Sequence, residues 1–172
     1  MVNLKITDER LQQEIDEKKH AEEELQGSEG EYRRLFEYSN DIIVQVDKFG
    51  KVLNVNNKLE EMLGFKPEEV IGKYFFNLGI LGITDLPRIV DLFKKTIRKG
   101  MTRDKAGRLL DKVELELRDK SGNLIFVETS TTLLKKEGKI EGFLTSIRDI
   151  TERKQAKEKL KASEEKYCTL VE

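Results

Sequence analysis

The sequence contains one cysteine, Cys168, one histidine, His20, and no tryptophan. A single cysteine excludes a disulfide bond within the chain, and one cysteine with one histidine excludes a Cys/His zinc cluster. No histidine lies between residues 35 and 150, which excludes a Ser-His-Asp catalytic arrangement from that part of the chain. The sequence also lacks a Walker-type phosphate loop, a kinase histidine box and a glycine-rich ATP lid. These absences predict a chain that is not itself an enzyme, whatever output domain a parent protein carries.

Long apolar runs and a strong net charge are missing as well. No stretch approaches the ~20 apolar residues of a membrane span, and nothing is typical of a signal peptide. We therefore expect a cytoplasmic segment without membrane contact. The formal net charge of −1 gives no overall field that would attract nucleic acid. Charged residues make up 38% and hydrophobic residues 37% of the 172 residues, which fits one modest core flanked by solvated helices.

The two ends of the chain repeat each other. Residues 14–37 align without a gap with residues 149–172, so that Leu25 matches Leu160 and Tyr32 matches Tyr167. The period is too long for a solenoid and is typical of one domain plus its connector. The repeat predicts one whole unit of a tandem array and the start of the next unit, within a longer parent protein.

Residues 1–26 predict a polar helix, because they contain no proline and no glycine. A thin heptad pattern runs along this segment, with Ile15 between four positions spaced by seven: Leu4, Leu11, Lys18 and Leu25. The pattern leaves two interpretations open, a dimer-forming coiled-coil helix and a solvated helix without a partner. We expect the helix to stop at Gly27, and Ser28 with Glu31 to form the capping box of a new short helix.

The middle of the chain predicts strands that are segregated from helices. Alternating apolar residues indicate five strands, at residues 41–47, 51–55, 110–118, 124–134 and 140–148. Between the second and third of these we expect two short helices, a buried irregular loop at 74–82 and one longer helix at 86–99. Asn56 fits the N-cap of the first short helix, and Asp149 with Glu152 fits a capping box for a charged exit helix. This order predicts an α+β fold, an antiparallel sheet with helices on one face.

Four segments in this order resemble the PAS family of sensory domains, including its C-terminal PAC motif. They are residues 54–57 with 63–65, residues 67–73, residues 118–122, and residues 142–154 (GFLTSIRDITERK). The resemblance implies a five-stranded antiparallel sheet with short helices and one longer helix on one face, flanked by N- and C-terminal signalling helices. It also implies a sensor in signal transduction, such as a tandem-PAS histidine kinase of a two-component system.

The resemblance also implies how the chain is organised and which residues pass on a signal. We expect an N-terminal linker or coiled-coil helix at 1–27, the sensor domain at 28–150, and an exit helix with the start of the next repeat at 151–172. Asp149, Ile150 and Thr151 match the family's signal-transmission motif. The expected partners are a second copy of the chain, bound through the flanking helices, and neighbouring PAS and output domains. The alternative is a ligand-free structural or protein-interaction spacer.

The residues argue against two cofactors that PAS domains use. Photoactive flavin-binding members carry a cysteine in the helical middle of the fold, and residues 74–82 have none. Haem-binding members commonly carry a histidine on the longer helix, and residues 86–99 have none. The sequence does not encourage noncovalent flavin either, since no phosphate-cradling loop is present. A noncovalent small organic molecule, or no ligand, remains.

The candidate pocket lies between the inner face of the sheet and the longer helix. Thr129, Thr131 and Thr145 are expected to point inward, where their hydroxyls meet either a ligand or a neighbouring backbone group or water. The aromatic residues Tyr74, Phe75 and Phe76 are candidates for stacking on an aromatic ligand, with core or loop packing as the alternative. Tyr74 and Phe76 are assigned to the pocket. In the loop after the longer helix, Arg103 and Arg108, together with Lys105, either close over an anionic group or are simply solvated. The sequence does not identify the ligand.

Overall fold

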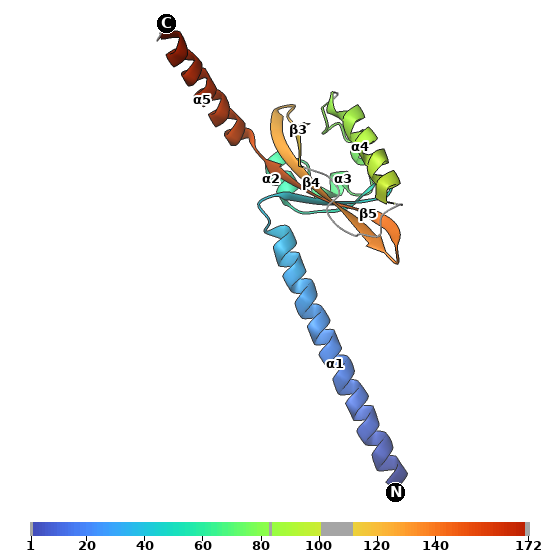
Figure 1. Ribbon diagram of the computed structural model, residues 1–172. Helices are drawn as coiled ribbons and strands as arrows, with labels where there is room; N and C mark the ends of the chain where they lie inside the picture. Colours follow the sequence, from blue (N-terminus) through green and yellow to red (C-terminus); the bar gives the residue numbers. More distant parts are fainter. Residues whose placement is uncertain (1, 83, 101–111, 171–172) are drawn as a thin grey trace. The chain divides into compact units, whose positions relative to one another are not determined.

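The computed structural model describes residues 2–82, 84–100 and 112–170 (Figure 1). The chain divides into two compact units, Met1–Tyr38 and Ser39–Glu172. The first unit contains one helix, and the second contains the sheet with its helices. The predicted α+β class with a five-stranded antiparallel sheet is confirmed.

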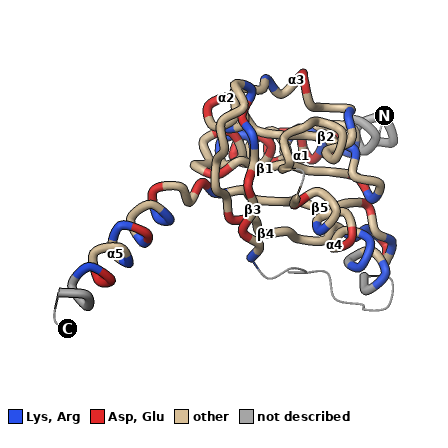
Figure 2. The backbone as a smooth tube through the Cα atoms, turned by 90° about the horizontal axis from the view of Figure 1, so that it is seen from above, with Lys and Arg blue, Asp and Glu red and all other residues tan. Residues whose placement is uncertain are grey.

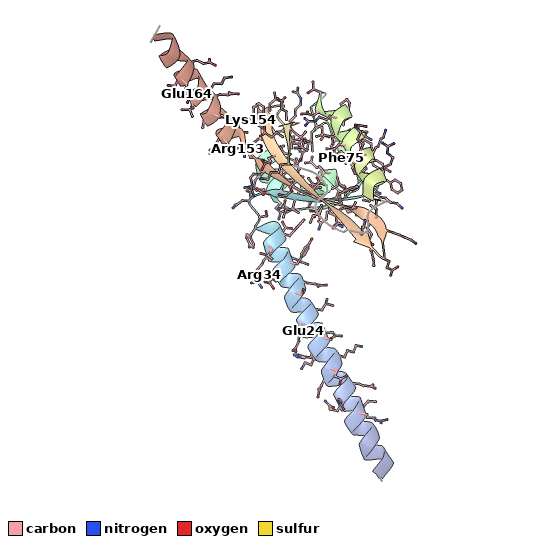
Figure 3. All side chains as sticks on the ribbon, in the orientation of Figure 1. Glu24, Arg34, Phe75, Arg153, Lys154 and Glu164 are labelled. Atoms are coloured by element: carbon pink, nitrogen blue, oxygen red, sulfur yellow. The ribbon has the colours of Figure 1, made fainter. Side chains whose placement is uncertain are left out.

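A single helix, α1, runs through Val2–Glu37. The predicted stop at Gly27 and restart at Ser28 is therefore wrong. A glycine inside a helix costs only about 1 kcal/mol, and the surrounding Glu, Gln and Lys residues are good helix formers. Most described side chains of α1 are exposed, including Glu24 and Arg34, which Figure 3 labels.

The sheet of the second unit has the strand order β2-β1-β5-β4-β3, with every neighbouring pair antiparallel. The strands are β1 (Ile42–Asp47), β2 (Val52–Val55), β3 (Val113–Arg118), β4 (Leu124–Lys136) and β5 (Lys139–Asp149). The long hairpin of β4 and β5 forms the middle of the sheet, so β5 lies between β4 and the first strand of the fold. A close approach at Gly142 makes this packing tight, because a Cβ there would collide with the carbonyl oxygen of Val46.

The helices follow the predicted order. They are α2 (Lys58–Leu63), α3 (Pro67–Val70), the 3-10 turn η1 (Phe75–Asn77), α4 (Asp85–Gly100) and the exit helix α5 (Thr151–Leu170). Gly64 ends α2 in the left-handed conformation, as its position predicts. Proline at the first helical position starts α3, and the Glu69 side chain accepts a hydrogen bond from the Lys66 backbone N–H (2.8 Å).

The core lies between one face of the sheet and the helices α2 to α4 (Figure 1). Leu115 and Leu117 of β3 and Val127 and Leu133 of β4 are buried, as the alternation along these strands predicts. The inner faces of β1, β2 and β5 add further aliphatic side chains and Phe143.

Asn56 is the one polar side chain buried among the described residues. Its Oδ1 accepts a hydrogen bond from the Ile43 backbone N–H (3.0 Å), and its Nδ2 donates to the Asp41 carbonyl oxygen (3.1 Å). The N-cap of α2 is the next residue, Asn57, so the predicted cap at Asn56 is wrong by one position. Asn56 joins the segment between β2 and α2 to the start of β1.

Candidate ligand cavity and exit junction

A cavity of about 170 Å³ lies inside the second unit, between the sheet and α4. All five strands contribute to its wall. On the opposite side the wall is formed by α2, α3, η1 and α4, with Ile89, Leu92 and Phe93 supplied by α4. Among the described lining residues the only polar side chains are three threonines.

The three threonines predicted to point inward lie on this wall. The Thr129 hydroxyl donates to the Val113 carbonyl oxygen on β3 (3.1 Å). Thr131 and Thr145 stand opposite each other on β4 and β5, and their hydroxyl oxygens lie 3.0 Å apart in a mutual hydrogen bond. The hydroxyl of Thr129 therefore bonds a neighbouring backbone group, as one of the two interpretations expected. A ligand contact for Thr131 and Thr145 stays a prediction.

Of the aromatic run 74–76, the described residue on the cavity wall is Phe75, and Phe93 and Phe143 also line it. Phe75, which Figure 3 labels, packs edge-on against Phe93 of α4, with ring centroids 5.6 Å apart. Tyr74 and Phe76 stack on each other at 5.3 Å, and Tyr74 is 42% exposed. Tyr74 and Phe76 are not among the described lining residues, and a ligand contact for them stays a prediction. Residues 75–77 form a 3-10 turn. Successive side chains of such a turn point about a third of a rotation apart, so only one of three faces the core.

The basic loop that was expected to close over an anion lies outside the described residues. This applies to Arg103 and Arg108 of the candidate site and to the neighbouring Lys105.

The junction between β5 and α5 is bonded to the middle of the sheet at one residue of β4, Phe126. The Ile150 backbone N–H donates to the Phe126 carbonyl oxygen (2.8 Å), and the Phe126 N–H donates to the Thr151 hydroxyl oxygen (3.2 Å). The Ile150 side chain is buried. Asp149 caps the turn, since its Oδ1 accepts from the Thr151 N–H (2.8 Å). These contacts fix the position of the first residues of α5 relative to β4.

A group of charged side chains, here called the anchor cluster, joins the first turn of α5 to β3 and β4. Its members are Glu114, Glu128, Arg153 and Lys154. The Arg153 guanidinium lies 3.2 Å from a Glu114 oxygen and 3.3 Å from a Glu128 oxygen. Lys154 lies 3.1 Å from the second Glu114 oxygen, and its ammonium stands 4.6 Å from the centroid of the Phe126 ring. Figure 3 labels both cations at the start of α5.

The sheet register explains why the anchor cluster needs cations. Glu114 and Glu128 are direct partners across β3 and β4, and like charges at such positions repel. Arg153 lies between them, and Lys112 adds a second ion pair to Glu128 (2.9 Å). The hydrogen bond from Lys112, followed by that from Arg153, lowers the pKa of the Glu128 carboxyl. Sequence reasoning missed this cluster, because the acids look like ordinary outward residues until the register is known.

A second ion pair holds the end of β5 to the start of β1. The Arg148 guanidinium binds the Asp41 carboxylate through two nitrogens, at 2.9 to 3.2 Å, and the Ser146 hydroxyl donates to the same carboxylate (3.2 Å). The hydrogen bond from Arg148 lowers the pKa of Asp41 below its ordinary value. The last residues of β5 are therefore held from both sides of the strand.

Two features are absent from residues 2–82, 84–100 and 112–170. No helix in this part of the chain is both long enough and apolar enough to cross a membrane. No group of three His, Cys, Asp or Glu side chains in it is arranged to hold a metal ion.

A family model described as "PAS domain" matches residues 39–152. The sensor protein kinase WalK of Staphylococcus aureus is 26% identical over 140 residues, which cover 80% of this chain. The aligned part is 20% to 30% of the WalK sequences, so the chain spans less than a third of these relatives.

Solved structures share the fold at lower identity. The PAS domain of an HTR-like protein from Haloarcula marismortui has a TM-score of 0.61 and 24% identity, covering 77% of this chain and 99% of that domain. The PAS domain of the Cronobacter turicensis RpfR quorum-sensing receptor, solved in complex with BDSF, has a TM-score of 0.53 and 22% identity. It covers 66% of this chain and 96% of that domain.

Proposed function

Because the chain belongs to the PAS domain family, we propose that it is a regulatory sensor module in which a small molecule in the cavity changes the start of the exit helix α5. The observation that carries this proposal is that one strand, β5, both lines the cavity and leads into the exit helix. Phe143, Thr145 and Ile147 of β5 line the cavity, and α5 begins at Thr151, four residues after Ile147.

The transmission step is assigned to Asp149, Ile150 and Thr151. A ligand that presses on the inner face of β5 would shift the strand against β4, and the bonds at Phe126 would pass this shift to the first turn of α5. In this proposal the anchor cluster switches between the observed arrangement, with Arg153 bound between Glu114 and Glu128, and one in which Arg153 is released. Packed elements with few alternatives convert small shifts into distinct states.

The RpfR structure supports a ligand-binding role, because that PAS domain of a quorum-sensing receptor was solved in complex with BDSF. The cavity of this chain, about 170 Å³, is well below the roughly 300–1,000 Å³ of sites for drug-sized ligands, so it favours a compact ligand over flavin or haem.

We extend the proposal to a homodimer formed through α1 and α5. Apolar side chains are exposed on these otherwise polar helices: Leu11, Ile15, Leu25, Tyr32 and Leu160. Leu11, Leu25 and Tyr32 share one heptad position, and Figure 2 shows acidic and basic residues interspersed along α5, as at the flanks of coiled coils.

The dimer is tested by light scattering over a concentration series. Burying one leucine contributes roughly 1.5–3 kcal/mol, so Leu25→Glu should weaken the dimer about tenfold or more. The neighbouring Gln26→Glu, off the heptad position, is the matched control. A wild-type chain that stays monomeric at high concentration contradicts the dimer.

The remaining parts of the proposal concern the parent protein. We place this segment in the cytoplasm, in a tandem array of PAS domains that ends in a histidine kinase or another output domain. The division into a linker (1–27), a sensor domain (28–150) and an exit linker (151–172) belongs to the same proposal.

The relay is tested without knowing the ligand, by filling the cavity with a side chain. Val44 lies on the wall and pairs with Thr145 of β5, so Val44→Met places extra volume against the strand that leads to α5. Hydrogen exchange of the Ile150, Thr151 and Lys154 amides is compared with wild type. Leu53→Met, at an exposed position of β2, is the control.

Changed exchange in Val44→Met, with unchanged exchange in Leu53→Met, is the expected result. Identical exchange in both variants contradicts the relay and favours the spacer alternative. Native mass spectrometry of the freshly purified, unsupplemented chain accompanies this experiment, because a constant extra mass would identify a retained ligand.

A further inference from the structure

The chemistry of the cavity wall restricts what it can bind. Apart from Thr129, Thr131 and Thr145, every described lining residue is aliphatic or phenylalanine. An ionised ligand would lose its hydration there without gaining a counter-charge from any described lining residue, and burying an unpaired charge is strongly unfavourable. The described wall therefore selects against carboxylates, phosphates and ammonium groups.

The size of the cavity restricts the ligand further. An apolar protein cavity of about 150 Å³ stays dry and binds benzene. The cavity of about 170 Å³ is of the same size, so it fits a single six-membered ring or a short chain.

The threonine pair supplies one hydrogen-bond donor. Each hydroxyl carries one hydrogen, so Thr131 and Thr145 have two between them. Their mutual bond uses one of these hydrogens. The other remains on the hydroxyl that accepts, and no hydrogen bond to another described group uses it. Thr129 offers no such donor, because its hydrogen is directed to the Val113 carbonyl oxygen.

We infer that the cavity binds a neutral, weakly polar molecule of about one ring, with a single acceptor oxygen (ketone, ether or alcohol) bonded to the Thr131–Thr145 pair. This inference rests on the proposed function and names the ligand class of the same site. The donor lies where β4 and β5 pair, so the ligand would contact the strand that continues into α5.

Three probes of similar size test the class on the full chain by ligand-observed NMR titration. Cyclohexanone carries the acceptor oxygen, methylenecyclohexane has the same shape without it, and cyclohexanecarboxylate adds a negative charge. The two neutral probes should bind, and the carboxylate should not. Carboxylate binding as tight as that of cyclohexanone overturns the neutral class.

The double variant Thr131→Val/Thr145→Val tests the donor while keeping the shape of the wall. A hydrogen bond is worth roughly 1 kcal/mol, so the affinity for cyclohexanone relative to methylenecyclohexane should fall about five- to tenfold. Thr132→Val, which pairs with Leu144 on the other face of β4, is the matched control and should leave the ratio unchanged. An unchanged ratio in the double variant overturns the donor assignment.

The probe experiment tests the ligand class and the Val44→Met experiment tests the relay, so either proposal can be refuted without the other. If neither neutral probe binds while Val44→Met still changes exchange at α5, the ligand class is wrong and the sensor proposal stands. If the neutral probes bind and neither they nor Val44→Met change exchange at α5, the ligand class holds and the relay is wrong.

Discussion

The side chain of Asn56 should be worth more to stability than its size suggests. Its amide satisfies two backbone groups at the start of β1, the Ile43 N–H and the Asp41 carbonyl, from a fully buried position. In Asn56→Ala both groups lose this partner, and leaving a buried group unsatisfied costs about 1–3 kcal/mol. We expect a loss of about 3 kcal/mol in the free energy of unfolding.

For a chain of this length, each 1 kcal/mol lowers the melting temperature by about 2–4 °C, so the expected decrease is about 6–12 °C. The measurement is thermal unfolding by circular dichroism, together with urea unfolding at fixed protein concentration. Asn77→Ala, at an exposed position of η1, is the control for loss of an amide side chain. A decrease below about 2 °C in Asn56→Ala would refute the reasoning, since it would mean that water replaces both hydrogen bonds.

Three other variants test the exit junction. Arg153→Ala should speed hydrogen exchange at Lys154 with little change in melting temperature, because it leaves Glu114 and Glu128 facing each other without the cation between them. Asp149→Ala should loosen the first turn of α5 without unfolding the sheet, because it removes the bond to the Thr151 N–H. Asp41→Asn should reduce the slope with which the free energy of unfolding falls as the pH drops below about 4. The pKa of Asp41 is lowered from 3.8 by Arg148, so its contribution is present above about pH 4 and is lost as the pH falls through the lowered pKa.

These three predictions have their own controls. Lys157→Ala, exposed further along α5, removes a cation outside the anchor cluster and should leave exchange at Lys154 unchanged. If Arg153→Ala behaves like this control, the cluster does not hold the helix. Wild-type exchange at Thr151 in Asp149→Ala would show that the cap is dispensable. Equal slopes of stability against pH below pH 4, in wild type and Asp41→Asn, would remove the role assigned to Asp41.

The sheet and its inner face could be predicted from the sequence because strand alternation is a local signal. Val127, Thr129, Thr131 and Leu133 appear on one face from their spacing alone, and the structure places them there. The long helix α1 was predicted in two pieces, because Gly27 next to a capping-box pattern looks like a boundary. A glycine weakens a helix by only about 1 kcal/mol, and the good helix formers around it outweigh that penalty here.

The missed parts of the candidate site depend on information that is not local. Choosing Phe75 over its two aromatic neighbours requires the 3-10 turn at residues 75–77. Gly50 leaves room for both Phe75 and Phe76, whose rings a Cβ there would approach to 2.7 and 3.2 Å. The anchor cluster requires the register that pairs Glu114 with Glu128. The volume of the cavity depends on how far the side chains of α4 reach toward the sheet. That distance cannot be predicted from the residue pattern of a single helix or strand.

The bonds around β5 suggest where a signal would leave the cavity. At one end of the strand, Gly142 lies so close to the Val46 carbonyl that the two strands have little freedom to slide. At the other end, the backbone bonds at Phe126 are accompanied by ion pairs of the exposed Arg148 and Arg153 side chains. Exposed ion pairs typically contribute only about 0–1 kcal/mol each, so they yield before the packed backbone does. A ligand in the cavity should therefore displace β5 mainly at its C-terminal end, where the strand leads into α5.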